Sequence, residues 1–218
     1  MSNDAAKTRY PGYDVLNKRD TSSWDAITRE VVDERMSTPL EPRFFNAAQW
    51  AALGALCDCI VAQSAQRSAV PVAALLDAHL FANDGDGWRD ARLPPLREAW
   101  CHGLAALDAE GAAGHDVPFM RLLPDQQTAL VKRMQRGELH AAAWQGMPSD
   151  VFFSKRVLHD LYGAYYSHPS AWSEIGFGGP ANPRGYVRLY KGRRDPWEAI
   201  EATADNADVV AQENARVR

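Results

Sequence analysis

The sequence predicts an all-α fold: a compact helical domain with long loops rich in glycine, proline and aromatic residues, and an extended N-terminal arm. Two observations support this class. Each long periodic segment repeats its apolar residues at helical spacing, and only residues 186–190 are compatible with a strand. With 46% hydrophobic and 24% charged residues, the composition is that of an ordinary globular protein. We expect the arm over residues 1–20, the helical domain over 21–202, and a polar tail over 203–218 that frays.

Two helices are expected in the first third of the chain. Thr21 or Ser22 can cap the first helix, because both are residue types that accept a hydrogen bond from the first turn. The apolar stripe expected on this helix is Trp24, Ile27 and Val31. Asn46 and Gln49 have the spacing of a capping box at the start of the second helix. One face of the second helix carries Trp50, Leu53, Cys57 and Ile60.

Prolines mark the starts of the remaining helices. Pro71 suits the first turn of a short helix, Pro95 precedes a longer one, and Pro124 opens the next. Pro148 opens the most apolar helix, which we expect to run through Tyr166 and to form the centre of the fold, because its apolar face is wide. The residues of that face are Phe152, Phe153, Val157, Leu158, Leu161, Tyr162 and Tyr165.

One segment, Ala171–Leu189, departs from this pattern. Its four glycines and two prolines exclude regular helix or strand. A phosphate-binding loop is disfavoured, because Pro180 and Pro183 remove backbone donors and no helical pattern follows in the next ten residues. The segment is nevertheless too apolar for a solvated loop, since it contains Trp172, Ile175, Phe177, Tyr186 and Val187. We expect it to pack against another surface, in this chain or in a partner.

Aromatic and arginine residues gather around this segment. The chain has seven tryptophans, and tryptophan, tyrosine and arginine are enriched at the centres of protein interfaces. We therefore predict a partner interface made of Tyr10, Tyr13, Trp24, Trp172, Ile175, Phe177, Arg184, Tyr186 and Arg188. The alternative is that the rings hold the long loops against the helical core.

The charge and hydropathy of the chain point away from several kinds of partner. A net charge of −4 and a pI near 5.9 give no reason to expect binding to nucleic acid or to an anionic membrane. No apolar run approaches the length of a membrane span. Neither a secretory nor a twin-arginine signal is visible at the N-terminus, so we expect a cytoplasmic location.

The sequence contains no convincing catalytic, cofactor-binding or metal-binding motif, and we expect none of these sites in this chain. Glu98 and His102 share a helix face at metal-compatible spacing, but two ligands do not complete a site. A metal-dependent enzyme using these two residues is the weakest alternative. The three cysteines, Cys57, Cys59 and Cys101, are odd in number and are expected to be mainly buried thiols.

Three blocks together resemble the gluconate 2-dehydrogenase subunit 3 family. They are FFNAAQWAALGALCDCIV (Phe44–Val61), PLREAWCHGLAALDAE (Pro95–Glu110), and MPSDVFFSKRVLHDLYGAYYSHPSAWSEIGFGGPANPRGYVRL (Met147–Leu189). The resemblance covers roughly residues 40–202, and the third block is its most specific part.

The resemblance implies a small, helical subunit without a cofactor of its own. Its partner would be a large FAD-dependent dehydrogenase of the glucose–methanol–choline (GMC) type that oxidises sugars, sugar acids or glycosides. A cytochrome c subunit often completes such complexes. The small subunit would help the flavoprotein to fold and remain bound to it; the alternative is a chaperone that leaves after assembly.

One departure from the family pattern bears on location. Many members begin with a twin-arginine signal, whereas this chain begins with a polar arm. The complex would then be cytoplasmic, or this subunit would reach the periplasm together with an exported partner.

Overall fold

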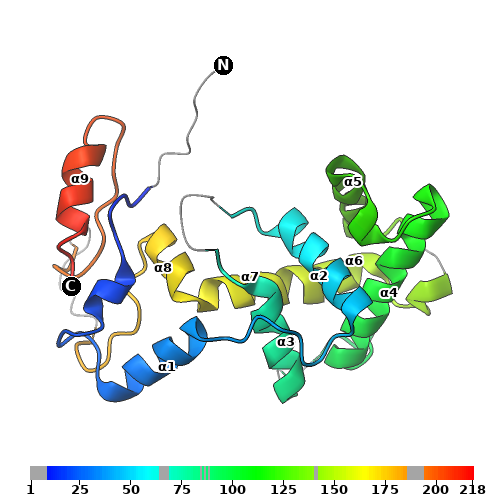
Figure 1. Cartoon of the computed structure of the whole chain (residues 1–218), viewed down its shortest axis with the longest axis horizontal. Helices are drawn as coiled ribbons and strands as arrows, with labels where there is room; N and C mark the ends of the chain where they lie inside the picture. Colours follow the sequence, from blue (N-terminus) through cyan, green and yellow to red (C-terminus); the bar gives the residue numbers. More distant parts are fainter. Residues whose placement is uncertain are drawn as a thin grey trace. The chain divides into compact units, whose positions relative to one another are not determined.

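A computed structural model describes residues 9–63, 69–83, 85, 87, 89–139, 142–185 and 194–218. Regular structure in these ranges is helical, apart from an isolated antiparallel bridge between Trp24 and Pro183 (Figure 1). The predicted all-α class is therefore confirmed. The strand considered for residues 186–190 lies outside the described residues.

The chain divides into two compact units. Unit 1 comprises the described residues within Met1–Ser37, Gln66–Val70 and Tyr166–Arg218, and unit 2 those within Thr38–Ala65 and Pro71–Tyr165. The helical elements of unit 1 are η1 (Val15–Lys18), α1 (Ala26–Met36), α8 (Pro169–Ile175) and α9 (Ala207–Asn214). Those of unit 2 are α2 (Ala47–Ile60), α3 (Val72–Ala82), α4 (Leu96–His115), η2 (Phe119–Arg121), α5 (Pro124–Gln135), η3 (Ala142–Trp144), α6 (Ser149–Phe152), a π-helical turn η4 (Phe153–Val157) and α7 (Leu158–Ser167), in which the boundary between the units falls.

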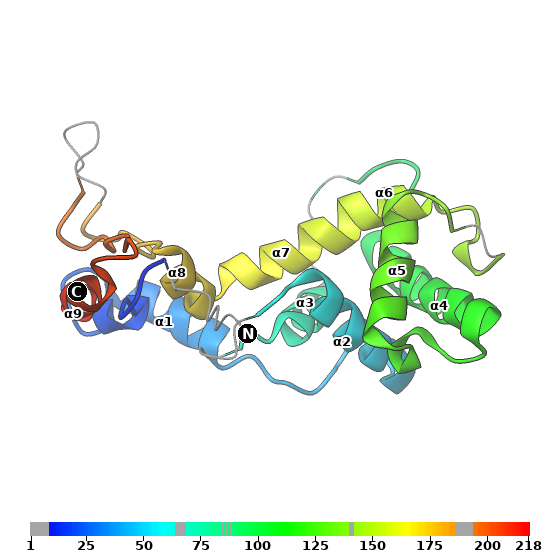
Figure 2. The ribbon, with the colours of Figure 1, turned by 90° about the horizontal axis from the view of Figure 1, so that it is seen from above.

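Helices α2, α4 and α5 of unit 2 contact one another through α2 (Figure 2). Their core contains the fully buried ring of Trp100, which packs edge-on against Phe152 with ring centroids 5.4 Å apart. Gly103 makes this approach feasible, because a Cβ there would overlap the Phe152 ring. The Trp100 indole donates to Asp160 at 2.7 Å, and Asp160 also pairs with the buried Arg156. The π-helical turn that carries Arg156 had no signal in the sequence.

Most expected helix starts are observed. The capping box is confirmed. The Asn46 side chain accepts a hydrogen bond from the Gln49 backbone N–H at 2.9 Å, and the Gln49 side chain accepts one from the Asn46 backbone N–H at 3.2 Å. Pro124 occupies the first turn of α5. Pro71 lies one residue earlier than expected, as the cap of α3 rather than within its first turn.

The start and the buried face of α1 differ from the prediction. Asp25, not Thr21 or Ser22, caps the helix and accepts from the Thr28 N–H at 2.8 Å. The buried stripe is Trp24, Thr28 and Val32, whereas Ile27 and Val31 are 70% and 40% exposed. The reason is tertiary: the Asp25 N–H donates to the carbonyl of Asn182 at 3.1 Å and the Trp24 ring is buried, which fixes the helix rotation.

The C-terminal tail is ordered over α9, so the expectation that it frays is wrong. Asn214 is fully buried, and its amide donates to the carbonyls of Pro11 at 2.9 Å and Ile200 at 3.0 Å. Figures 1 and 2 show α9 beside the N-terminal segment. Val210 and Val217 are also buried. The tail needs few apolar residues of its own, because Val217 packs into a core cluster that also contains Tyr13 and Val15 of the N-terminal arm.

Candidate functional site

The glycine-rich segment begins later than the sequence suggested. Residues 171–175, expected to be irregular, form most of α8, which starts with Pro169 in its first turn and ends at Gly176 in a left-handed conformation (φ 70°). Proline favours a first helical turn and glycine favours this ending, so both residues delimit the helix rather than prevent it. From here on, "glycine-rich segment" denotes residues 176–185.

Backbone and side-chain hydrogen bonds within unit 1 hold the glycine-rich segment. The Phe177 N–H donates to the Trp172 carbonyl at 2.9 Å, and the Phe177 carbonyl accepts from the Tyr13 hydroxyl at 3.1 Å. The Trp24 indole donates to the Pro180 carbonyl at 3.1 Å. Gly179, with a positive φ of 71°, lies against Val15 and Trp24 so closely that a Cβ would be 3.0 Å from the Val15 methyl group. The segment is therefore fixed before any partner is present.

A buried lysine, Lys18, contacts the tyrosine that binds the glycine-rich segment. Lys18 is fully buried, and its Nζ donates to the Tyr13 hydroxyl at 2.9 Å. Burial, with a smaller contribution from the positive charge of Arg184, lowers the Lys18 pKa to about 8. The chain of hydrogen bonds Lys18–Tyr13–Phe177 thus links the N-terminal arm to the glycine-rich segment.

Two apolar side chains at the C-terminal end of α8 face solvent. Ile175 is 44% exposed and Phe177 is 41% exposed, although the Phe177 ring also packs edge-on against Trp172 at 5.8 Å. They stand on a backbone that is already held in place, which is a favourable arrangement for a protein contact.

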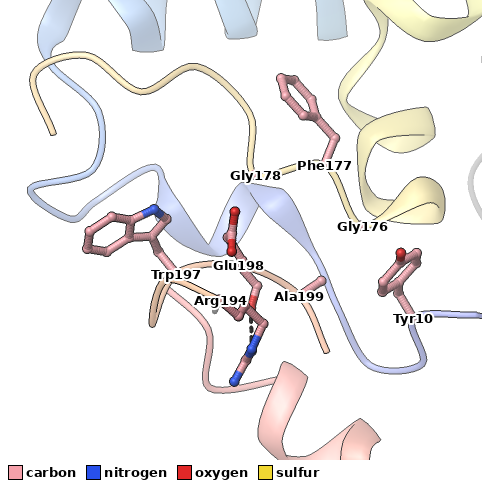
Figure 3. Close-up of a pocket in the computed structure, with 8 residues that line it drawn as sticks. All are labelled: Tyr10, Gly176, Phe177, Gly178, Arg194, Trp197, Glu198 and Ala199. Atoms are coloured by element: carbon pink, nitrogen blue, oxygen red, sulfur yellow. Dashed lines mark hydrogen bonds between the residues drawn. The ribbon is translucent and has the colours of Figure 1, made fainter. Parts of the chain in front are cut away.

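A pocket of about 240 Å³ opens beside these residues. The described residues that line it are Tyr10, Gly176, Phe177, Gly178, Arg194, Trp197, Glu198 and Ala199 (Figure 3). Figure 3 shows Phe177 and Trp197 on opposite sides of Gly178, and the Arg194 side chain directed toward α9 with a hydrogen bond to the Glu198 carbonyl at 2.6 Å. The Arg184 guanidinium lies over the Trp197 ring, 4.9 Å from its centroid.

The predicted interface residues fall into three groups. Tyr13, Trp24 and Trp172 lie in the hydrophobic core of unit 1, at 2–4% exposure, because their rings cover one another and Val15. These three therefore serve internal packing, as the alternative interpretation of the aromatic residues expected. Ile175 and Phe177 are exposed, whereas Tyr10 and Arg184 are half-buried and the guanidinium nitrogens of Arg184 are buried. Tyr186 and Arg188 lie outside the described residues.

Sequence reasoning did not select Lys18, Trp197 or Glu198. Trp197 has one recognisable signal, a tryptophan in a loop after a proline, but nothing in the sequence places it beside Gly178. Lys18 has no signal at all, because an isolated lysine in a polar arm is expected to face solvent.

The candidate metal ligands and thiols stand as follows. Among the described residues, no three His, Cys, Asp or Glu side chains come together as a metal-ligand group, and the pair Glu98 and His102 acquires no third member there.

Cys57 is buried, whereas Cys59 and Cys101 are half-buried, so the expectation of buried thiols holds fully only for Cys57. Burial raises the Cys57 pKa to about 12, which keeps the thiol protonated. Within the described ranges no helix is both long and apolar enough to cross a membrane.

A family model described as gluconate 2-dehydrogenase subunit 3 matches residues 47–179. The match extends from α2 through α8 to Gly179, so it includes Phe177 and Gly178 but not Tyr10 or Trp197. No curated protein and no solved structure matches this chain.

Proposed function

Since this chain belongs to the gluconate 2-dehydrogenase subunit 3 family, a family of small subunits of dehydrogenase complexes, we propose that it binds and stabilises a large FAD-dependent partner of the GMC type. The partner oxidises a sugar, a sugar acid or a glycoside, and it carries the flavin and the catalytic groups. A cytochrome c subunit is a further candidate member of the complex.

The observation that carries this proposal is the exposure of Phe177 and Ile175 on a fixed backbone. Exposed aromatic and aliphatic side chains at a rigid position lose little conformational freedom on docking, so most of their burial contributes to affinity. We propose that the interface is centred on these two side chains and includes Tyr10 and Arg184. Tyr186 and Arg188 belong to the same proposal from their place in the sequence.

The adjacent pocket is too small to hold a flavin nucleotide. Its volume of about 240 Å³ is below the range of about 300–1,000 Å³ typical of small-molecule pockets. A flavin nucleotide would need a much larger cavity, which agrees with placing FAD in the partner.

The test is a tagged pull-down of this subunit from its native cells, followed by a visible absorbance spectrum of the eluate. We expect a large chain at a one-to-one ratio and the absorbance of an oxidised flavin. A colourless preparation that contains the tagged chain alone would contradict the proposal and favour a chaperone that leaves after assembly. A haem absorbance would add the cytochrome subunit.

We propose the cytoplasm as the place where the two subunits meet, with export alongside the partner as the alternative. Cell fractionation followed by detection of the tag distinguishes these two locations.

A further inference from the structure

Helix α1 exposes two aliphatic side chains that the sequence predicted to be buried. Ile27 and Val31 are both exposed, and they lie one turn apart on the same side of the helix. The buried stripe of α1 is formed by Thr28 and Val32 instead, so the core of unit 1 does not use the exposed pair. Two adjacent aliphatic side chains form the kind of apolar stripe that a helix buries when it packs against another element.

Two glutamates lie beside this aliphatic pair. Glu30 and Glu34 are exposed and one turn apart, and each follows one of the aliphatic residues by three positions, which makes them neighbours on the helix surface. Among the described residues, no hydrogen bond or ion pair engages either carboxylate. Asp33 differs, because it pairs with Arg19. The α1 strip, as we name this surface, consists of Ile27, Glu30, Val31 and Glu34.

The α1 strip stands on a helix that is fixed at both ends. At its start, Asp25 caps the helix, and the Asp25 backbone N–H donates to the Asn182 carbonyl at 3.1 Å. At its end, the Arg35 guanidinium donates to the Ser167 carbonyl at 2.9 Å and lies over the Trp172 ring, 5.6 Å from its centroid. A partner therefore meets a preformed surface, and docking costs little conformational entropy.

The α1 strip and the proposed interface at Ile175 and Phe177 belong to the same unit, in which α1 contacts α8. A stable protein interface buries about 800 Å² on each partner, with about 20–30 residues on each side. Two exposed side chains supply only a small part of that area, so a lasting complex needs further contact surface. The exposed face of α1 offers such a surface on an already ordered helix.

The composition of the α1 strip defines the chemistry of its complement. An occupant needs apolar side chains to cover Ile27 and Val31, and lysine or arginine side chains to pair with Glu30 and Glu34. A second copy of this chain would bring the same acidic residues to the contact, and an anionic membrane would also repel them. The occupant that fits is a protein segment with apolar and basic side chains on one face, such as an amphipathic helix.

We propose that the α1 strip binds a basic amphipathic segment of the large dehydrogenase subunit. This inference rests on the function proposed above. Apolar side chains of the segment cover Ile27 and Val31 and supply most of the affinity. Its basic side chains pair with Glu30 and Glu34, which orients the segment and speeds association, because exposed ion pairs add little net stability. Helix α1 precedes the residues that match the family model, so the match does not assign this surface.

The test is a competition between variants inside the cell. Each small-subunit variant is co-expressed with the wild-type subunit and a limiting amount of the flavin-containing chain recovered in the pull-down, and the ratio of the two small subunits in the purified complex is measured by mass spectrometry. The double variant Ile27→Ala/Val31→Ala removes the apolar contact and is expected to compete at least about tenfold less well. The double variant Glu30→Lys/Glu34→Lys opposes the basic segment with like charge and is expected to compete about three- to tenfold less well.

The matched control is on α9 of the same unit, where Val209 and Glu213 are likewise exposed and one turn apart. The double variant Val209→Ala/Glu213→Lys is expected to compete like wild type. Circular dichroism of each variant establishes that the helices are retained. Competition at the wild-type level by both α1 variants would overturn the assignment of the α1 strip while leaving the subunit function intact. Failure of the wild-type subunit to recover any flavin-containing chain would instead overturn the proposed function.

A second measurement identifies the occupant directly. The photo-reactive amino acid p-benzoylphenylalanine is placed at position 31 or, as a control, at position 209, and the purified complex is irradiated. Cross-links from position 31 to one segment of the large chain that contains lysine or arginine, with none from position 209, are expected. Cross-links from position 31 only to this chain, within one copy or between two copies, would overturn the proposal, as would cross-links only to a haem-containing chain.

Discussion

Lys18 lies fully buried in unit 1 and donates to Tyr13, whose hydroxyl in turn donates to the backbone of Phe177. Burial and the positive charge of Arg184 both lower the Lys18 pKa, and the negative charge of Asp14 offsets them only in part. A lysine whose pKa falls from 10.5 to about 8 on folding costs about 3 kcal/mol at neutral pH. The hydrogen-bond chain to Phe177 is thus maintained against a penalty.

This penalty predicts an unusual dependence of stability on pH. Between about pH 8 and about pH 10.5 the unfolded chain keeps a proton on Lys18 that the folded chain has released, so the Lys18 contribution makes the folded state more stable as pH rises. Below about pH 8 the penalty is constant. In Lys18→Met this contribution is absent. Urea unfolding of both proteins should show the free energy of wild type rising by about 3 kcal/mol relative to Lys18→Met across that window; parallel pH curves would contradict the assignment.

Phe177 and Trp172 touch each other but are expected to respond differently to truncation. Trp172 is 4% exposed in the core, so Trp172→Ala should destabilise unit 1 by about 3–5 kcal/mol. Phe177 is 41% exposed, so Phe177→Ala should cost only about 1 kcal/mol of stability while weakening the complex by at least about 2 kcal/mol. Chemical denaturation measures the first quantity and titration of the partner the second. Equal losses of stability would mean that Phe177 is a core residue.

Among the helices, the sequence predicted starts better than orientations. Capping and proline signals are local, so Asn46 and Pro124 mark helix starts where they were expected. Which face of a helix is buried depends on residues distant in sequence. The bridge between Trp24 and Pro183 and the bond from Asp25 to Asn182 turn α1 so that Ile27 faces solvent.

The candidate site was predictable to the same extent. The sequence predicted that the apolar segment with glycines packs against another surface, and of its described apolar side chains Ile175 and Phe177 are exposed. Local pattern could not separate them from Trp172, which belongs to the same apolar set but lies on the inner face of α8. The local pattern also could not predict that Trp197 and Gly178 line the same pocket, because their proximity depends on the tertiary path of the C-terminal part of the chain.

Two glycines in neighbouring helices provide a test of helix packing in unit 2. In α4, a Cβ at Gly103 would overlap the Phe152 ring, so Gly103→Ala should destabilise the unit by about 1–3 kcal/mol. In α2, no atom of another described residue lies within 4 Å of a Cβ added to Gly54, so Gly54→Ala should stabilise the unit by about 0.5–1 kcal/mol through helix propensity. Thermal unfolding of the two variants should shift in opposite directions. A shift in the same direction would contradict the close packing of α4 on α6.

Segments from both ends of the chain meet in unit 1, so the proposed interface at Ile175 and Phe177 depends on residues far from it in sequence. The Arg9 guanidinium pairs with Glu201 at 2.6 Å, and the Ala202 N–H donates to the Arg9 carbonyl at 2.9 Å. The Arg9 and Glu201 side chains lie on the surface, where an ion pair adds little stability. The buried connection is Asn214, which joins Pro11 to Ile200 and packs in the same unit as Tyr13 and Val217.

Asn214→Ala should therefore loosen unit 1 and spare unit 2. The substitution leaves the carbonyls of Pro11 and Ile200 and the Ile200 N–H without their partner, at a combined cost of about 3 kcal/mol or more. Hydrogen exchange should accelerate in α8 and the glycine-rich segment but not in α2 and α4, because local opening follows the cooperative unit in which the contact is lost. Glu213→Ala, an exposed neighbour on α9, is the control and should leave exchange unchanged. Binding to the partner should weaken in Asn214→Ala, although Asn214 does not line the pocket, because Phe177 and Gly178 would no longer be held in place. Unchanged exchange in α8 would show that the contact of Asn214 with Pro11 and Ile200 does not hold α8 and the glycine-rich segment in place.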